Sequence, residues 1–494
     1  MNQADSGFSE TQISNRIAEF AAGLSLDHVP SEVIDYARHL VLDAVGCALA
    51  ARPEAFAHVY SAAITELAGV SGAASDAAHG CAVIGQAFRL PVREAALLNG
   101  ILAHGLDFDD THIAGIAHLS VAVWPAVMAL AAHHQRSGRQ AFLAYVVGLE
   151  VGSRVAAAAP GLFHARGFHP TLTVGLFAAA VACAQLLGLD RDGIHRAQGF
   201  ALSMTGGSLQ FVEDGAWTKR LHPGWAASSG IACAILARHP IPTPGKVYEG
   251  RFGLFRAFLG DANQDQVALG QITDHLGAHW QLKGIGVKPF PVCHFNHACA
   301  DASIALHRRL FQAGASIRSI RRIEVRAPKG VMPSVCEPAD IKRHPTTEYE
   351  AKFSMHYAVA CGLLRGHLGL EDLAPDAIAD PEVGALMRRV DCVADPASTF
   401  PRHYTGEVVL FFEDGTTMAH RENVNRGHAE RPLDNDAIQA KFRANAARAL
   451  SAAQVQALER FIVSMDADLR SLRTMDSLVT PEPPSPLSIQ ESRP

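Results

Sequence analysis

A short stretch of the chain, residues 104–118, concentrates groups that can act as acids, bases or ligands. It runs His104-Gly-Leu-Asp-Phe-Asp-Asp-Thr-His112 and is closed by His118, so three carboxylates, one hydroxyl and three imidazoles fall between two apolar segments. Burying so many ionisable groups costs free energy unless they are paired, and packing alone does not explain them. We therefore expect the chemistry of this protein to be here.

Carboxylates and imidazoles at this density could bind a divalent metal ion. Asp107, Asp109 and Asp110 offer oxygen ligands, and the neighbouring histidines offer nitrogen ligands. On a helix, however, Asp107 and Asp110 would align while Asp109 would face elsewhere. The spacing therefore favours a site without a metal, and we expect none to be bound.

Three histidines stand just ahead of apolar segments that should be helical. They are His118, His169 and His222, and the last two are followed directly by proline, which suits the first position of a helix. Helix N-termini bind anions, and the same field keeps an imidazole neutral, as a general base requires. Together the three could form a floor for a carboxylate, although each alone could also be a structural residue.

Two segments add cations to this set. Lys219 and Arg220 precede His222 in an expected loop, where one of them could reach an anion held at the helix start, or both could simply be solvated. Lys288 opens a segment whose prolines bar a regular helix. In the same segment Cys293 could be a nucleophile, but covalent catalysis needs a partnered base that the sequence does not reveal.

A third segment, residues 350–357, places Lys352 and His356 four residues apart, so that they could share one helical face, with Tyr357 next to them. Standard signatures are missing elsewhere: the chain has no GxGxxG after a strand, no GxxxxGK[ST], no HExxH and no GxSxG. Nucleotide binding, zinc proteolysis and serine hydrolysis therefore have no support from motifs.

The elements that must position these groups are mainly helices. Apolar residues recur at helical spacing over 30–45, and similar or wholly apolar segments cover 91–103, 120–133, 140–157, 171–187, 191–204 and 225–238. Helices that are apolar all round must be covered on every side, which predicts a multi-layer helical domain.

The pattern changes near residue 275. The pattern predicts a strand over 320–327 and a hairpin of two strands over 406–421 that turns at Asp414-Gly415. A helix is expected between them, over 353–368. A helical pattern returns over residues 433–472. We therefore predict a mainly α protein with a smaller α+β domain: a helical domain over 1–275, the α+β domain over 276–428, a second helical part over 429–477, and a disordered tail over 478–494.

Composition narrows the class of function. The chain has 494 residues, 48% of them hydrophobic, and a net charge of −6, which gives no general attraction for nucleic acid or an anionic membrane. Its nine cysteines form no CxxC pair and no signal peptide precedes them, which is typical of a reduced, cytoplasmic protein. The apolar run over 171–189 is interpreted as a buried helix and not as a membrane span.

The run from Asn99 to His112 resembles a hallmark of the MmgE/PrpD family, whose members include 2-methylcitrate dehydratase, cis-aconitate decarboxylase and iminodisuccinate epimerase. Four further segments match family blocks in order: 168–171, 218–224, 288–293 and 351–357. The resemblance covers residues from about 10 to 470. It implies a helical domain built from both chain ends, an inserted lid domain, an active site in the cleft between them, and a cofactor-free homodimer.

The resemblance also implies the site residues. It transfers the family's site to Asp107, Thr111, His118, His169, Lys219, Lys288 and Tyr357. Adding our own candidates, we expect a catalytic set and a substrate-binding set for a small polycarboxylate. The catalytic set is Asp107, His118, His169, Lys219 and Tyr357, with His118 or Lys219 as the base and Tyr357 or His169 as the acid. The substrate-binding set is Thr111, His222, Lys288, Cys293 and Lys352.

Two departures bear on the reaction. The loop between Thr111 and His118 is one residue longer than in the animal decarboxylases, and Cys293 stands where those enzymes carry a lid histidine. We therefore expect a 2-methylcitrate dehydratase-like hydro-lyase, with a cis-aconitate decarboxylase-like carboxy-lyase and an iminodisuccinate-type epimerase as alternatives. A non-catalytic carboxylate-binding protein is the rival class. The joint presence of Asp107, His169, Lys219 and Tyr357 argues against it, because a decayed site should lose some of them.

Overall fold

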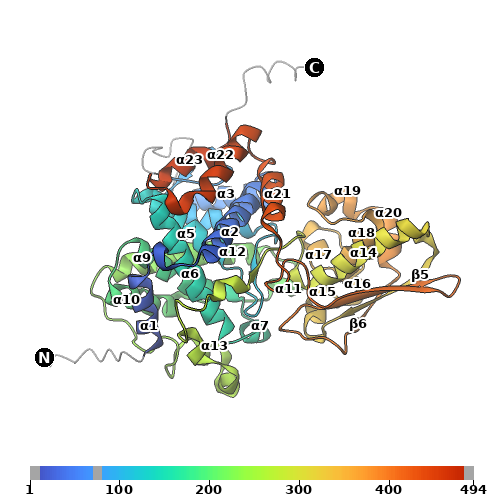
Figure 1. Ribbon diagram of the computed structural model, residues 1–494, viewed down its shortest axis with the longest axis horizontal. Coiled ribbons are helices and arrows are strands. Elements are labelled where there is room, and N and C mark those ends of the chain that lie inside the picture. Colours follow the sequence, from blue (N-terminus) through green and yellow to red (C-terminus); the bar gives the residue numbers. More distant parts are fainter. Residues whose placement is uncertain (1–11, 70–79, 483–494) are drawn as a thin grey trace, which may run out of the picture.

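Two hydrophobic cores divide the chain. The computed structural model describes residues 12–69 and 80–482. One core runs from Ile13 to Val287 and resumes from Ile438 to Val479, and the other runs mainly from Phe290 to Phe412. In Figure 1 the first forms the larger helical body and the second a smaller body beside it. The mainly α class with a smaller α+β portion is confirmed. The boundary lies after Val287, beyond the expected residue 275, because residues 280–287 pack into the first core.

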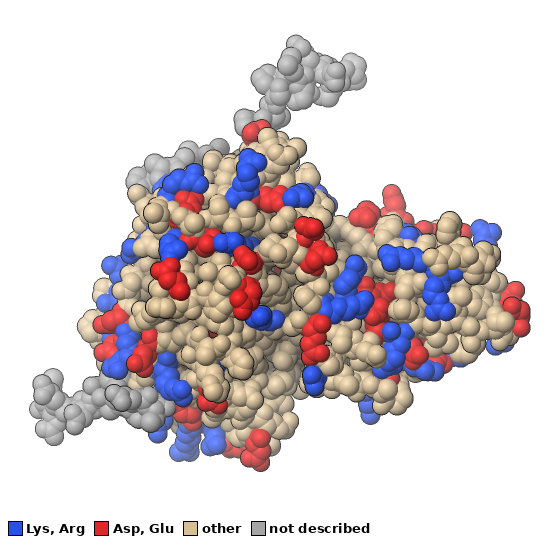
Figure 2. Space-filling model, viewed as in Figure 1, with Lys and Arg blue, Asp and Glu red and all other residues tan. Residues whose placement is uncertain are grey.

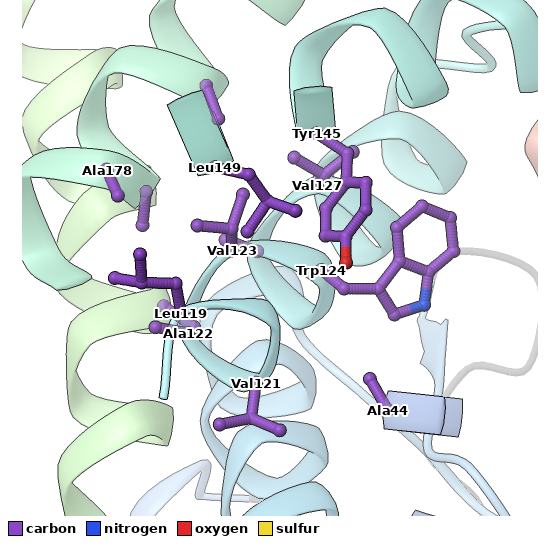
Figure 3. Close-up of a cluster of buried hydrophobic side chains, with 14 of the residues drawn as sticks. Ala44, Leu119, Val121, Ala122, Val123, Trp124, Val127, Tyr145, Leu149 and Ala178 are labelled. Atoms are coloured by element: carbon purple, nitrogen blue, oxygen red, sulfur yellow. The ribbon is translucent and has the colours of Figure 1, made fainter. Parts of the chain in front are cut away.

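The helical domain is built around helix α5 (Ser120–His133), which is buried along its length from Ser120 to Ala132. Because it is apolar on every face, it must be enclosed by other helices. It packs against α4, α6, α9 and α12. Figure 3 shows this packing, with the Trp124 and Tyr145 rings edge to face at 5.6 Å between centroids. The predicted all-round burial of this segment is confirmed.

The helical domain contains these further elements: α1 (Ile13–Gly23), α2 (Ser31–Ala50), α3 (Ala55–Leu67), β1 (Cys81–Ala82), β2 (Arg89–Leu90), α4 (Val92–His104), β3 (Thr111–His112), α6 (Gly138–Ala157), α7 (Leu162–Ala165), α8 (Pro170–Thr173), α9 (Gly175–Leu186), α10 (Arg191–Met204), α11 (Phe211–Asp214), α12 (Thr218–Ala237), α13 (Leu254–Leu259), β4 (Ile285–Gly286), α21 (Asn435–Ala446), α22 (Ala452–Val463) and α23 (Met475–Val479).

Helix α12 begins earlier than the sequence predicted. It starts at Thr218 and contains Pro223, so Lys219 lies in its first turn and His222 inside the helix. The predicted loop over 219–220, and the predicted helix start after His222, are therefore wrong. The helix passes very close to α4, because a Cβ on Gly100 would lie 2.5 Å from the Cα of Gly224. This close crossing brings the loop after α4 next to the first turn of α12.

The smaller domain, which we call the lid domain, holds a four-stranded sheet in the order β6-β5-β7-β8. Strands β5 and β6 are parallel, and the other pairs are antiparallel. The predicted strand and the predicted hairpin are confirmed as β5, β7 and β8, with Gly415 in the hairpin turn at φ +86. Helices α14 and α18 cover the sheet, as Figure 1 shows. Its elements are α14 (His297–Ala313), β5 (Ile320–Ala327), α15 (Met332–Val335), α16 (Ala339–Lys342), α17 (Glu348–Lys352), α18 (Met355–Arg365), α19 (Pro375–Ile378), α20 (Pro381–Met387), β6 (Val390–Ala394), β7 (Gly406–Phe412) and β8 (Thr417–Glu422).

The C-terminal part of the chain returns to the helical domain, where α21 packs along α2 (Figure 1). The expected tail begins later than residue 478, since Val479 is buried in the first core. The rest of that tail, residues 483–494, lies outside the described residues. Acidic and basic side chains are interspersed on the face seen in Figure 2. Within the described residues, no helix combines the length and hydropathy needed to cross a membrane.

Candidate active site

The stretch over 104–118, the start of α12 and the segment after β4 meet at a buried cavity between the two domains. Its volume is about 40 Å³. The structure brings seven of the predicted site residues to its wall: Asp107, Thr111, His118, His169, Lys219, Lys288 and Cys293. A space of that size holds one or two water molecules, so a substrate needs more room than this arrangement leaves.

A three-residue charge cluster occupies one wall. The Asp107 Oδ1 atom accepts hydrogen bonds from Lys219 Nζ at 2.8 Å and Lys288 Nζ at 2.7 Å, and Lys288 Nζ also donates to the Asp107 carbonyl at 2.8 Å. All three side chains are at most 8% exposed. Burial opposes the charged forms, but the two lysines hold the pKa of Asp107 well below its usual range. The cluster therefore carries one net positive charge next to the cavity.

The backbone at Asp107 is left-handed, with φ 53. Aspartate tolerates this conformation better than most residues other than glycine, at a cost of roughly 1–2 kcal/mol. The turn lets the carboxylate and carbonyl of Asp107 both face Lys288, and the adjacent Arg220 guanidinium donates to the Gly105 carbonyl at 2.9 Å. The loop after α4 is thus tied to both neighbouring segments.

A second group orients His118. Its Nδ1 atom lies 2.7 Å from the Asp110 carbonyl and 3.0 Å from Asp109 Oδ2. Because a carbonyl only accepts, Nδ1 carries the proton, and Nε2 is the nitrogen that remains for a substrate. Asp109 also accepts from His104 Nδ1 at 2.9 Å. Burial opposes its charge, yet the two imidazoles hold the pKa of Asp109 well below its usual range.

Asp109 is therefore a positioning residue that sequence reasoning undervalued. A carboxylate behind an imidazole fixes the ring and stabilises its protonated form. Asp110 has a different environment, since its carboxyl accepts from Ser120, which accepts from Tyr145 at 2.7 Å. Burial raises the pKa of Asp110 well above its usual value. These two hydrogen bonds connect Tyr145, in the core around α5 that Figure 3 shows, to the loop that carries the site.

His169 lies on the cavity wall but both of its ring nitrogens are engaged. Nδ1 lies 2.9 Å from His222 Nδ1, and Nε2 lies 3.0 Å from Thr171 Oγ1. Burial lowers the pKa of His169 well below 6.5 and that of His222 to about 4, so both rings are neutral near pH 7. The Thr171 hydroxyl in turn accepts from the His118 amide at 3.1 Å. His222 therefore supports His169 from behind and does not line the cavity.

Besides His222, two predicted residues, Tyr357 and Lys352, are not at the cavity. The Tyr357 hydroxyl donates to the Asp372 carbonyl, within the lid domain. Lys352 Nζ pairs with Glu348 at 2.5 Å and borders a different, larger cavity. The predicted face shared by Lys352 and His356 does not exist, because α17 ends at Lys352 and a new helix begins at Met355, capped by Ser354. The assignment of Tyr357 as an acid and of Lys352 as a substrate ligand is therefore corrected.

Cys293 lines the cavity as a neutral thiol, because burial raises its pKa. Thiolate chemistry therefore has no support in this arrangement. The cavity wall also includes residues that sequence reasoning missed, because they lie in helices and loops without a distinguishing pattern. The polar ones are His164, His294, Ser334 and Tyr404. Burial lowers the pKa of His164 to about 4, so this ring too is neutral near pH 7.

The side chains also permit a test of the metal hypothesis. His104, Asp107, Asp109 and His118 offer ligand atoms within 4.8 Å of one another. However, Asp107 already contacts two ammonium groups, and Asp109 accepts from two imidazoles. Two neighbouring cations repel a divalent ion, so the donor set does not fit one.

Comparisons with known proteins identify the family of this chain. The MmgE/PrpD N-terminal domain matches residues 15–267, and the MmgE/PrpD C-terminal domain matches residues 290–467. The chain is 30% identical over 493 residues to human cis-aconitate decarboxylase, covering 96% of this chain and 95% of that protein. It is 27% identical over 480 residues to the cis-aconitate decarboxylase of Aspergillus terreus, covering 94% and 95%. It is 26% identical over 450 residues to the 2-methylcitrate dehydratase of Cupriavidus necator, covering 86% and 88%. The chain therefore belongs to the MmgE/PrpD family.

Proposed function

We propose that this protein is a lyase acting on a small tricarboxylate, and that its reaction is the decarboxylation of cis-aconitate or a close analogue. The observation that carries the proposal is the cluster in which Lys219 and Lys288 share the Asp107 carboxylate beside His118. Paired ammonium groups bind carboxylates and stabilise the enolate-like charge that forms when a bond next to a carboxylate breaks. His118 supplies the proton transfer that such chemistry needs.

The relatives favour the carboxy-lyase over the hydro-lyase that the sequence led us to expect. The cis-aconitate decarboxylases of human and Aspergillus terreus align with 96% and 94% of the chain, whereas the 2-methylcitrate dehydratase of Cupriavidus necator aligns with 86%. Cys293 motivated the hydro-lyase, and its neutral thiol is compatible with either reaction. We retain dehydration of 2-methylcitrate as the second candidate on the strength of that relative.

The proposed decarboxylation needs one proton and one bond cleavage. Lys219 and Lys288 hold carboxylates of the substrate, and protonated His118 delivers a proton from Nε2 to a substrate carbon. The bond to the departing carboxylate breaks, its electron pair shifts the double bond, and carbon dioxide leaves. A trianion and a proton thus become a dianion and carbon dioxide. Asp109 stabilises the imidazolium before transfer, and the neutral ring is recharged from solvent when the domains open.

The second candidate would use the same groups in another order. His118 would first remove a proton from the carbon next to a carboxylate, and hydroxide would then leave with the help of an acid. Since His169 has both ring nitrogens engaged, the ammonium groups of Lys219 and Lys288 would serve as the acid. The requirement for a second proton donor makes dehydration the more demanding reaction for this cavity.

Product analysis tests the proposal. The purified protein is incubated separately with cis-aconitate, 2-methylcitrate, citrate and iminodisuccinate in D₂O, and each mixture is followed by NMR. Decarboxylation predicts an unsaturated five-carbon dicarboxylate from cis-aconitate, carrying one deuterium, with release of carbon dioxide. Loss of water from 2-methylcitrate alone would select the hydro-lyase, and interconversion of the diastereomers of iminodisuccinate, with deuterium uptake next to a carboxylate, would select the epimerase. No change in any mixture, with binding detected by calorimetry, would leave a carboxylate-binding protein.

We also propose that the active form is a homodimer. Sedimentation equilibrium should give about twice the chain mass of 52.7 kDa. A single species at the chain mass that retains full activity would contradict this.

A further inference from the structure

We propose that Lys441, on helix α21, is a positioning residue of the active site. Its ammonium group fixes the two loops that carry Asp107 and Lys288. The expected effect of Lys441 on turnover rests on the proposed function, whereas its effect on the position of the two loops does not. It also gives a role to the C-terminal segment that returns to the helical domain.

One ammonium group reaches both loops from behind. Lys441 Nζ donates to the Phe108 carbonyl at 2.6 Å and to the Lys288 carbonyl at 2.9 Å. It also lies 3.8 Å from the centre of the Phe108 ring, a cation–π contact. Phe108 is the residue after Asp107. The group therefore holds the backbone at, or next to, both members of the Asp107–Lys288 pair.

A buried counter-ion holds Lys441 itself. Asp43 Oδ1, on α2, lies 2.5 Å from Lys441 Nζ, and the two side chains are 0% and 8% exposed. Two hydrogen bonds and one ion pair surround the ammonium group. Because α21 packs along α2, the Lys441 side chain has a rigid base. An ammonium satisfied in this way has a fixed position, as a positioning role requires.

Lys441 does not touch the substrate cavity. Residues on the two loops alternate between cavities: Asp107 and Lys288 face the small one, whereas Phe108 and Pro289 face a second cavity of about 1,080 Å³ that Lys441 also lines. The loops are thus a thin wall, with the catalytic lysines on one side and Lys441 on the other. This arrangement separates positioning from chemistry.

The wall needs such support because of its shape. Asp107 is held at φ 53, and Lys288 Nζ must meet both its carbonyl and its carboxylate. Without Lys441 the two loops keep the Asp107–Lys288 contacts on the cavity side and the β3–β4 pairing next to them, but they lose the contacts on the side of the large cavity. A displacement of about 1 Å at a reacting group costs roughly 100-fold in rate, so loosening this wall should lower turnover without removing any group that binds substrate.

The test compares Lys441→Met with Lys441→Arg and with Arg448→Met. Arg448 borders the same large cavity but pairs with Glu54 at 2.9 Å, away from the loops. We expect Lys441→Met to lower kcat by about 10- to 100-fold with KM within about threefold of wild type, by analogy with the loss of residues that orient a site. Lys441→Arg should recover part of kcat, because it keeps the charge and the donors. Arg448→Met should match wild type.

Crystal structures of the same variants separate this inference from the proposed function. Lys441→Met should lengthen the contact between Asp107 Oδ1 and Lys288 Nζ, which is 2.7 Å in the wild type, whether or not any tricarboxylate is turned over. If the wild type is inactive on all substrates, the proposed function fails, and the distance between Asp107 Oδ1 and Lys288 Nζ alone decides whether Lys441 positions the two loops. An unchanged distance with unchanged kcat would overturn the inference, as would equal losses in Lys441→Met and Arg448→Met.

Discussion

Replacing Asp107 by asparagine is the perturbation that the geometry defines most sharply. The substitution keeps the shape of the side chain and, since asparagine tolerates the left-handed backbone, adds little strain at φ 53. It removes the one negative charge between Lys219 and Lys288. Any effect therefore reports on charge and not on shape.

The magnitude follows from the two contacts. At 2.7 Å and an effective dielectric constant of about 20, the attraction of one unit-charge pair is roughly 6 kcal/mol before desolvation. Removing one partner of a buried pair typically costs about 3–5 kcal/mol of folding free energy. At roughly 2–4 °C per kcal/mol, Tm should fall by about 6–20 °C, and the size of this chain places it toward the lower end.

Catalysis should respond in a distinctive way. Burial opposes a charge on Lys288, and Asp107 raises its pKa above the ordinary value. Without Asp107 that pKa must fall, so the alkaline limb of the pH profile should move to lower pH. We expect kcat/KM to drop at least about 10³-fold, equivalent to roughly 4 kcal/mol. A tricarboxylate that occupies the cavity should recover part of the lost Tm by supplying the missing negative charge.

The assay measures Tm, kcat and KM across pH for Asp107→Asn and for Asp27→Asn. Asp27 pairs with Arg139 at 2.8 Å, but the two side chains are 80% and 36% exposed, so this isosteric control should change stability by no more than about 1 kcal/mol. Wild-type kcat/KM and Tm in Asp107→Asn would refute the charge cluster as the centre of the site.

Four further substitutions test the neighbouring assignments. Asp109→Asn should lower kcat by about 10- to 100-fold, less than in a triad, since the Asp110 carbonyl still holds the tautomer of His118 at 2.7 Å; steady-state kinetics with unchanged kcat would remove Asp109 from the site. Cys293→Ser should keep activity within about tenfold, because burial raises the thiol pKa and no thiolate takes part; complete loss would support a nucleophile. Tyr357→Phe should retain kcat but cost about 1 kcal/mol in denaturant unfolding, as only a hydrogen bond inside the lid domain is lost; abolished turnover would restore the tyrosine to the mechanism. Burial lowers the pKa of His112 from 6.5 to about 4, so its neutral ring stabilises the fold above pH 6.5, and this contribution is lost as the pH falls toward 4. Calorimetry between these pH values should show that His112→Asn takes up about one proton fewer than the wild type on unfolding. An unchanged dependence of the unfolding free energy on pH would be inconsistent with this assignment.

Residue type and spacing were sufficient to locate the site but not to assign every role. The stretch over 104–118 was recognisable because its charges are too dense for packing, and helix α5 because it is apolar on every face. Both are local properties of the sequence. Asp109 was undervalued for the opposite reason: its role depends on where the loop places it relative to His118, which no local pattern encodes.

The errors share one physical cause, which is that spacing predicts a common face only along an unbroken helix. Lys352 and Tyr357 fall on either side of a helix break at Ser354, so they face different surroundings. Lys219 was expected in a loop because Pro223 suggested a helix start, but this helix tolerates proline after its first turn. Lys441 was missed since it resembles any basic residue of an amphipathic helix and lies far along the chain from the loops that it contacts.

The most direct test of decarboxylation at this site is the product that this protein forms from cis-aconitate in D₂O, compared with the product formed by Lys288→Met. We predict that the wild type releases carbon dioxide and forms a five-carbon unsaturated dicarboxylate with one deuterium bound to carbon. Lys288→Met, which loses the contact to Asp107 at 2.7 Å, should form at least about 10³-fold less. If the wild type forms no product from any tricarboxylate, or if Lys288→Met forms product at an equal rate, decarboxylation by this charge cluster is wrong.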